Sequence, residues 1–256
     1  MTEQSFDFGV TPAALSSLYP RLYHMAHEDA WPQIQRHGLL STRSILNLWE
    51  VETAQRARIE GEIRPAAVEL THPRHGKVVI RDQKPMNEKK LRSALIDCTP
   101  EDWCRLLNSK IFFWPCVDRL NTHMAARGNR GKTHLVLTLD SYRLVKSYEQ
   151  QIALCAMNSG NTNPFPQRRG KSSFMRMSQY PFGARRKRGF YYTVVELAVD
   201  RDIPDILIFV LTADYMTSDG KVSRVVGDPF AKPGGGLSKR DGGNLTWPPG
   251  KMEISR

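Results

Sequence analysis

Apolar residues recur along the chain with two different spacings, which predict a mixture of helices and strands. Spacings of three and four residues are typical of amphipathic helices, and short runs of β-branched and aromatic residues are typical of strands. The first pattern predicts helices over residues 28–38, 43–58, 87–96, 99–107, 117–126 and 142–148. The second predicts strands over residues 18–25, 66–70, 77–80, 111–115, 133–139, 151–157, 190–199 and 207–211.

The two ends of the chain lack this periodicity. Residues 1–17 are polar, and we expect them to be frayed or weakly docked. Residues 228–256 are basic and rich in Gly and Pro, which is typical of a flexible tail. One domain is therefore predicted over residues 18–227. Within it, residues 158–189 form the least regular stretch, and a loop this long is usually functional or disordered.

One carboxylate interrupts the strongest strand pattern. Glu196 lies within the apolar run 190–199, where a charge is unfavourable unless it is paired or faces a cleft. Two interpretations are open. Glu196 is either an edge-strand residue that faces water, or a carboxylate that works in a site.

The charge balance favours a polyanionic partner. The formal net charge is +11 at pH 7, and two basic clusters, 168–171 and 185–188, lie within the irregular stretch. Aromatic residues flank these clusters at Phe165, Phe174, Tyr180, Phe182 and Phe190. Phosphate contacts combined with aromatic stacking are how proteins hold single-stranded nucleic acid. RNA or single-stranded DNA is the predicted partner; the alternatives are an anionic membrane, or a charge that serves only solubility.

Several common chemistries lack their motifs. The chain has no phosphate-binding Gly-rich loop, no HExxH and no nucleophile elbow. His72 and His75 lie three residues apart without a Cys or carboxylate at ligand spacing, so we expect a solvated turn and no metal. The four cysteines lack CxxC spacing, and no apolar run has transmembrane length, which predicts reduced thiols in a cytoplasmic protein without a membrane span.

Two segments resemble DarT-like NAD-dependent ADP-ribosyltransferases. The segments Tyr23–Met25, Asp29–Ile34 and His37–Leu39 resemble the first signature of that group: a strand with Tyr and His, a short helix with an Ile, and then Gly-Leu. The run Val195–Val199, followed by Ile203-Pro204, resembles its catalytic strand. The similarity spans roughly residues 18–211, with specific matches at its two ends.

The resemblance implies an α+β fold with an ADP-ribosyltransferase-like split mixed β-sheet and a cleft for NAD as substrate. It implies that His24 hydrogen-bonds an NAD ribose or the adjoining amide, with Tyr23, Met25, Gly38 and Phe113 as further NAD-binding residues. It also implies that Glu196 is the catalytic carboxylate. This role suits the chemistry, because breaking the nicotinamide glycosidic bond builds positive charge on the ribose.

The resemblance further implies an arginine at the NAD phosphates or the acceptor. Arg119 is the candidate, and Arg81 and Arg169 are alternatives. Arg169 and the cluster Arg185, Arg186, Lys187 and Arg188, which precedes Glu196, are expected to bind the acceptor.

Three functions remain open from the sequence. The first is an ADP-ribosyltransferase that modifies RNA or single-stranded DNA, as a toxin or anti-phage effector with an antitoxin protein or an ADP-ribosyl hydrolase as partner. The second keeps NAD but has a protein side chain or an RNA 2′-phosphate as acceptor. The third is a non-catalytic nucleic-acid-binding module in which Glu196 is merely structural.

Overall fold

Two four-stranded sheets and a separate hairpin make up the β structure of the computed structural model, which describes residues 8–84, 86–189 and 193–226. The first sheet has the order β1 (Arg21–His27), β5 (Thr133–Asp140), β9 (Val210–Thr217) and β10 (Val222–Val226). The second has the order β4 (Lys110–Phe113), β8 (Glu196–Asp200), β6 (Ile152–Cys155) and β7 (Met175–Arg176). The hairpin consists of β2 (Val68–His72) and β3 (Gly76–Ile80).

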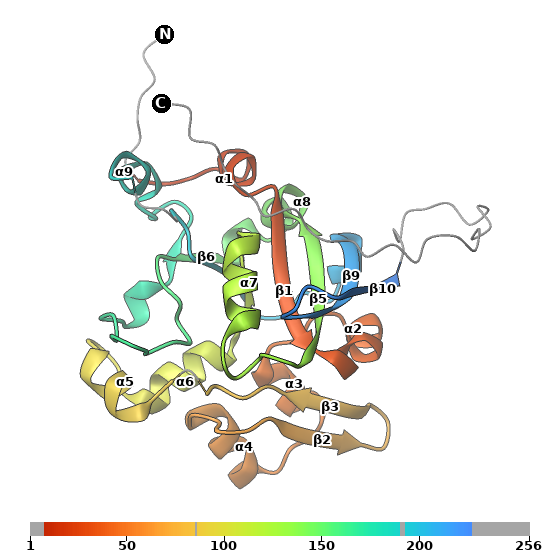
Figure 1. Ribbon diagram of the computed structural model, residues 1–256. Helices are drawn as coiled ribbons and strands as arrows, with labels where there is room; N and C mark the ends of the chain where they lie inside the picture. Colours follow the sequence, from red (N-terminus) through yellow and green to blue (C-terminus); the bar gives the residue numbers. More distant parts are fainter. Residues whose placement is uncertain (1–7, 85, 190–192, 227–256) are drawn as a thin grey trace, which may run out of the picture.

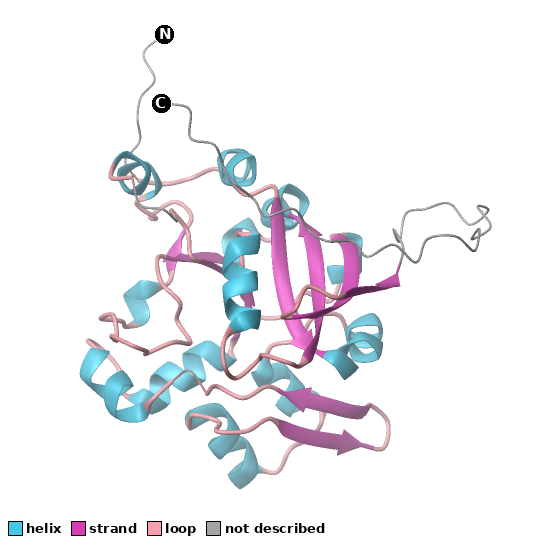
Figure 2. Ribbon diagram, in the orientation of Figure 1, coloured by secondary structure: helices cyan, strands magenta, loops and turns pink. Residues whose placement is uncertain are grey.

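Nine helices among the described residues surround these strands (Figure 1 and Figure 2). They are α1 (Pro12–Leu18), α2 (Trp31–His37), α3 (Thr42–Leu48), α4 (Thr53–Gly61), α5 (Glu88–Ala94), α6 (Pro100–Asn108), α7 (Val117–Ala125), α8 (Ser141–Ser147) and α9 (Phe182–Lys187). Helix α7 lies across the face of β1, where Leu120 and Met124 pack against Tyr23 and Met25. Within the described parts of the chain, no helix is both long and apolar enough to cross a membrane.

The two large sheets meet at one point. Tyr23 in β1 and Trp114, just after β4, exchange backbone hydrogen bonds of 2.9 and 2.8 Å. Phe113, the residue before Trp114, pairs with Leu197, the residue after Glu196. The bridge thus places Glu196 where the two sheets part. The largest apolar cluster combines side chains from both sheets with α1, α2 and α8.

The α+β prediction is confirmed, but the expected mixed sheet is wrong. Every strand pair within the three described sheets is antiparallel. The described part of the expected strand 190–199 also begins later, because residues 190–192 lie outside the described residues and β8 starts at Glu196. Glu196 is therefore the first residue of its strand.

The single helix expected over residues 43–58 is also wrong. The chain forms α3 and α4 with a break between them, where Glu50 adopts a positive φ of 52° that a right-handed helix does not allow. The Glu52 carboxylate then accepts the backbone N–H groups of Ala54 and Gln55 at 2.9–3.1 Å and starts α4. Local capping therefore overrides the continuous apolar spacing.

The expectation of a weakly docked segment over residues 1–17 fails for its described part. Thr11 caps α1, and Leu15 is 1% exposed within the main core. The strand expected over 207–211 is displaced, since a 3₁₀ turn occupies Ile206–Ile208 and β9 runs from Val210 to Thr217. The expected basic tail, 228–256, lies outside the described residues.

Candidate functional site

An elongated cavity of about 480 Å³ opens beside the bridge between the two large sheets. Its walls come from β1, β3, β4, α3 and α7, together with residues 158–161 after β6. Six candidate residues named from the sequence line it: His24, Met25, Gly38, Arg81, Arg119 and Glu196. They are separated by up to 172 positions in the chain, and the fold brings them to one cavity.

Glu196 is a buried carboxylate on the cavity wall. Its strand lies between β4 and β6, and the residue is only 4% exposed, so the interpretation as a water-facing edge residue is wrong. Its Oε2 accepts the backbone N–H of Ser159 at 3.0 Å. Burial raises the pKa of Glu196 to about 7, although the Ser159 hydrogen bonds and the charges of Arg119 and Arg169 act in the opposite direction.

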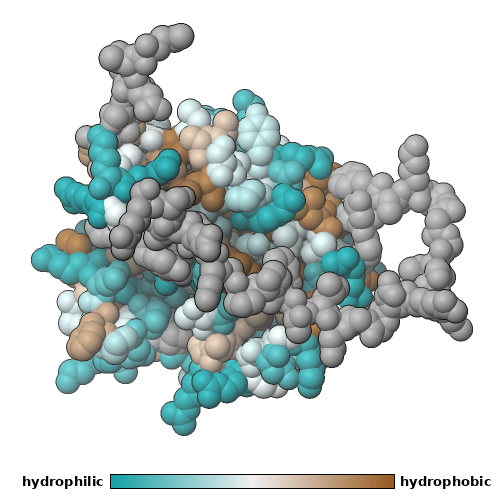
Figure 3. Space-filling view, turned by 45° about the horizontal axis from the view of Figure 1, so that its top comes forward, coloured by the Kyte–Doolittle hydropathy of each residue, from teal (hydrophilic) through white to brown (hydrophobic). Residues whose placement is uncertain are grey.

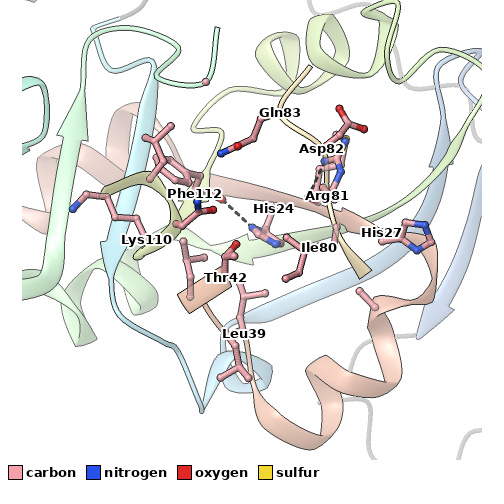
Figure 4. Close-up of a pocket in the computed structure, with 18 of the residues that line it drawn as sticks. His24, His27, Leu39, Thr42, Ile80, Arg81, Asp82, Gln83, Lys110 and Phe112 are labelled. Atoms are coloured by element: carbon pink, nitrogen blue, oxygen red, sulfur yellow. Dashed lines mark hydrogen bonds between the residues drawn. The ribbon is translucent and has the colours of Figure 1, made fainter. Parts of the chain in front are cut away.

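His24 presents a neutral imidazole to the same cavity. Its Nδ1 lies 2.9 Å from the carbonyl oxygen of Phe112, and burial lowers its pKa to about 4 (Figure 4). At neutral pH the Nδ1–H group donates to that carbonyl, so Nε2 carries a lone pair that accepts hydrogen bonds. The nearby charge of Arg81 favours the same neutral state.

Three arginines line the cavity: Arg64, Arg81 and Arg119. The guanidinium of Arg64 donates to the carbonyl oxygens of Ile59 and Arg81. Arg81 donates to the carbonyl oxygen of Met25 at 3.3 Å and to Asn129 Oδ1 at 2.9 Å, which fixes its position beside His24 (Figure 4). Arg119 lies on α7, and its charge lowers the pKa of Glu196. Phosphate groups are the ligands that such planar donors bind best.

Aromatic side chains also line the cavity. Trp114 packs against the His123 ring with centroids 5.3 Å apart, and Trp49 packs against His37 at 5.7 Å. All four residues line the cavity. The spacing assigns Trp49 to the core, and it is 4% exposed in a core cluster. Trp114 and His123 were not identified from the sequence, because an aromatic residue beside a strand or on a helix is indistinguishable from core by spacing alone.

Three of the expected NAD-binding residues have structural roles. Phe113 is fully buried in the core, and Tyr23 is 8% exposed and supplies the bridge to Trp114. Gly38 has a φ of 75°, and a Cβ atom there would lie 2.4 Å from the Cα of Pro204. Gly38 therefore allows two backbone segments to approach closely at the cavity wall.

None of the residues expected to bind the acceptor lines the cavity of Glu196, although Arg169 lines a second cavity beside it. Arg169 is 1% exposed and donates to the carbonyl oxygens of Ser159, Asn161 and Gln167 at 2.8–3.0 Å, so it holds the loop after β6. The cluster Arg185–Arg188 belongs to α9 and the residue after it, and none of its members lines the cavity. Figure 1 places α9 near α1, away from the β2–β3 hairpin.

The histidine pair at the β2–β3 turn is less solvated than expected. His72 is 9% exposed, and its Nδ1 accepts the backbone N–H groups of Arg74 and His75. The two rings stack with centroids 4.7 Å apart. Across residues 8–84, 86–189 and 193–226, no cluster of three or more His, Cys, Asp or Glu side chains is arranged to hold a metal ion.

Comparison with protein families places most of the chain in one of them. A family model described as a family of unknown function (DUF7002) matches residues 20–210, a range that includes His24, Arg119 and Glu196. No curated protein matches the chain.

Proposed function

We propose that the chain, which belongs to the DUF7002 family of unknown function, is an NAD-dependent ADP-ribosyltransferase that modifies nucleic acid. The observation that carries the proposal is the buried Glu196 carboxylate on the wall of a cavity that also contains the neutral His24 and the charged Arg119. Burying a carboxylate is unfavourable for stability, and such groups are concentrated at functional sites.

The cavity residues fit the chemical parts of NAD. A volume of about 480 Å³ lies within the range of small-molecule sites. The Nε2 lone pair of His24 suits a ribose hydroxyl donor, and the guanidinium groups of Arg81 and Arg119 suit the pyrophosphate. The half-buried Trp114 offers an aromatic surface to a planar ring. These assignments agree with the resemblance to DarT-like enzymes for His24, Glu196 and Arg119.

The proposed reaction needs one carboxylate near the ribose. The glycosidic bond breaks and its electron pair leaves with neutral nicotinamide, while positive charge develops on the ribose next to ionised Glu196. A lone pair of the acceptor forms the new bond to the ribose carbon, and the acceptor proton passes to Glu196. Since the pKa of Glu196 is about 7, this group accepts a proton readily at neutral pH.

The net charge of +11 supports nucleic acid as the acceptor class. Hydrophilic residues cover much of the described surface in Figure 3, with smaller hydrophobic patches between them. Modified DNA or RNA blocks replication or translation, so we propose a toxin or anti-phage role. The expected partner is then an antitoxin protein or an ADP-ribosyl hydrolase.

The test is transfer of label from NAD that is labelled in the adenosine. Purified protein is incubated with single-stranded DNA, RNA or total cell protein, beside the variants Glu196→Gln and Glu60→Gln. Glu60 is a matched control, because it is equally buried but pairs with Arg56 and Arg105 and does not line the cavity. Label should enter one nucleic-acid pool with wild type and E60Q, and not with E196Q.

Two other results would change the proposed acceptor or overturn the proposed enzyme class. Label that enters only protein, or only RNA carrying a 2′-phosphate, would keep the enzyme class and change the acceptor. No transfer by any protein, combined with equal salt-sensitive nucleic-acid binding by wild type and E196Q, would leave a non-catalytic binding module.

A further inference from the structure

A second cavity lies directly against the first. It has a volume of about 340 Å³, and Arg119, Asn158 and Asn161 line both cavities. Val195, which precedes the Glu196 carboxylate in the chain, lines the second cavity, whereas Glu196 lines the first. Two ligands, one bound in each cavity, would therefore lie next to each other beside Glu196.

Amide and guanidinium side chains make up most of the wall of this second cavity: Asn158, Asn161, Asn163, Gln167, Arg119 and Arg169. The Oδ1 atom of Asn158 accepts the backbone N–H of Gly160 at 3.1 Å, and that of Asn161 accepts the N–H of Asn163 at 2.8 Å. Both side-chain oxygens are thus engaged, and the NH₂ groups are the ends with donors to offer. Together with the guanidinium of Arg119, they suit a planar group whose edge carries carbonyl oxygens or ring nitrogens.

An exposed aromatic side chain stands at this cavity. Phe165 lines it and is 87% exposed, the highest exposure of any large hydrophobic residue in the described parts of the chain. The exposed phenyl ring at the cavity wall offers a face that a planar ligand can cover, which removes apolar surface from water. A nucleobase does so by stacking, whatever its sequence.

The loop that carries Phe165 is anchored before this residue and also after it, where Arg169 donates to the Gln167 carbonyl oxygen at 3.0 Å. Arg169 donates to the carbonyl oxygens of Ser159 and Asn161, and Lys90 Nζ donates to Asn163 Oδ1 at 2.7 Å and to the Pro164 carbonyl oxygen at 3.1 Å. The phenyl ring is therefore presented on a fixed segment. The positive charge of Lys90, whose Nζ donates to the Pro164 carbonyl oxygen next to Phe165, suits the phosphates that flank a base.

We propose that the second cavity is the acceptor subsite, which takes one unpaired base of a single-stranded nucleic acid with Phe165 stacked on it. The proposal rests on the proposed function and locates the acceptor away from the basic helix α9. A nitrogen of the bound base forms the new bond to the ribose carbon as nicotinamide leaves with the electron pair of the broken bond. The proton of that nitrogen passes to Glu196.

The test compares Phe165→Ala with Phe8→Ala. Phe8 is a matched control, because it is 65% exposed and lines neither cavity. Each protein receives labelled NAD with and without a single-stranded oligonucleotide, and the label transferred to the oligonucleotide is divided by the label released by hydrolysis. Loss of one stacking contact should lower this ratio about 5- to 150-fold for F165A. F8A should leave it within about twofold, and Phe165→Trp should restore it.

The outcomes separate this inference from the proposed function. If wild type transfers label and F165A has the same ratio of transfer to hydrolysis, the second cavity is not the acceptor subsite. The proposed enzyme class would still stand. The acceptor subsite is also wrong if label enters only protein and the F165A variant transfers as much label to protein as wild type does. If wild type releases no nicotinamide under any condition, the proposed function fails and the acceptor subsite fails with it.

Discussion

Replacement of Glu196 by glutamine should stabilise the folded protein, and the gain should depend on pH. The pKa of Glu196 is about 7, against 4.5 for an unperturbed glutamate, because burial disfavours the ionised carboxylate. The folded protein thus binds this proton more tightly than the unfolded chain does. The resulting stabilisation is complete below about pH 4.5 and is lost as the pH rises through about 7.

The magnitude follows from these two pKa values. Their difference of about 2.5, at about 1.36 kcal/mol for each pKa unit, means that wild type loses about 3 kcal/mol across this range. Glutamine keeps an oxygen that accepts the Ser159 N–H group and does not ionise. The free energy of unfolding of E196Q relative to wild type should therefore increase by about 2–3 kcal/mol between pH 5 and pH 8.

Urea unfolding of both proteins at pH 5 and pH 8 measures this difference. The control is again E60Q, in which a buried carboxylate loses ion pairs of 3.1 Å with Arg56 and Arg105. This variant should be less stable than wild type by about 1–3 kcal/mol at pH 8. A stability difference between E196Q and wild type that is the same at both pH values would refute the reasoning.

Further predictions concern the cavity and its supports. The value of kcat/KM for nicotinamide release should rise with pH with a midpoint near 7, because the ionised form of Glu196 is required; a flat profile from pH 5.5 to 8.5 would contradict this. His24→Phe should weaken NAD binding, measured by calorimetry, about tenfold, because the His24 Nε2 hydrogen-bond acceptor is lost. Unchanged affinity would show that His24 does not bind NAD. Gly38→Ala should lower stability in urea by about 3 kcal/mol or more, since its Cβ would overlap Pro204; a change below about 1 kcal/mol would show that the backbone yields there. Arg169→Met should cost about 3 kcal/mol or more in the same assay, because three carbonyl oxygens lose their donor, and an equally stable variant would mean that water replaces it.

Local signals in the sequence identified several elements correctly. Thr99 followed by Pro100 and two acidic residues marks the start of α6, and the structure has a capping box between Thr99 and Asp102. The turn between residues 72 and 76 separates β2 from β3 as expected. These elements depend on neighbours in sequence, which a single chain displays.

Elements that depend on tertiary contacts were missed. Helix α1 is short and polar, and it is stabilised by Leu15 packing into a core built from distant strands. The apolar spacing over residues 43–58 does not reveal the positive φ at Glu50. The pairing of β10 with β9 is likewise a contact that no periodicity encodes.

The candidate site was predictable where a residue type was chemically unusual for its position. Glu196 stood out as a charge in an apolar run, and His24 and Arg119 followed from a family resemblance; all three line one cavity. A buried arginine cannot be distinguished from an exposed one by sequence pattern alone. Arg169 and the α9 cluster therefore appeared alike, although the first is fully enclosed and the second is largely at the surface.

The central claim is that the Glu196 carboxylate drives cleavage of the nicotinamide bond. The most direct measurement is chromatographic quantification of nicotinamide released from NAD at pH 8 by wild type and E196Q, with NAD binding measured on the same samples by calorimetry. The account predicts a loss of release on the order of 10²- to 10³-fold in E196Q with binding retained. Equal release by the two proteins, or no release by wild type that binds NAD, would contradict it.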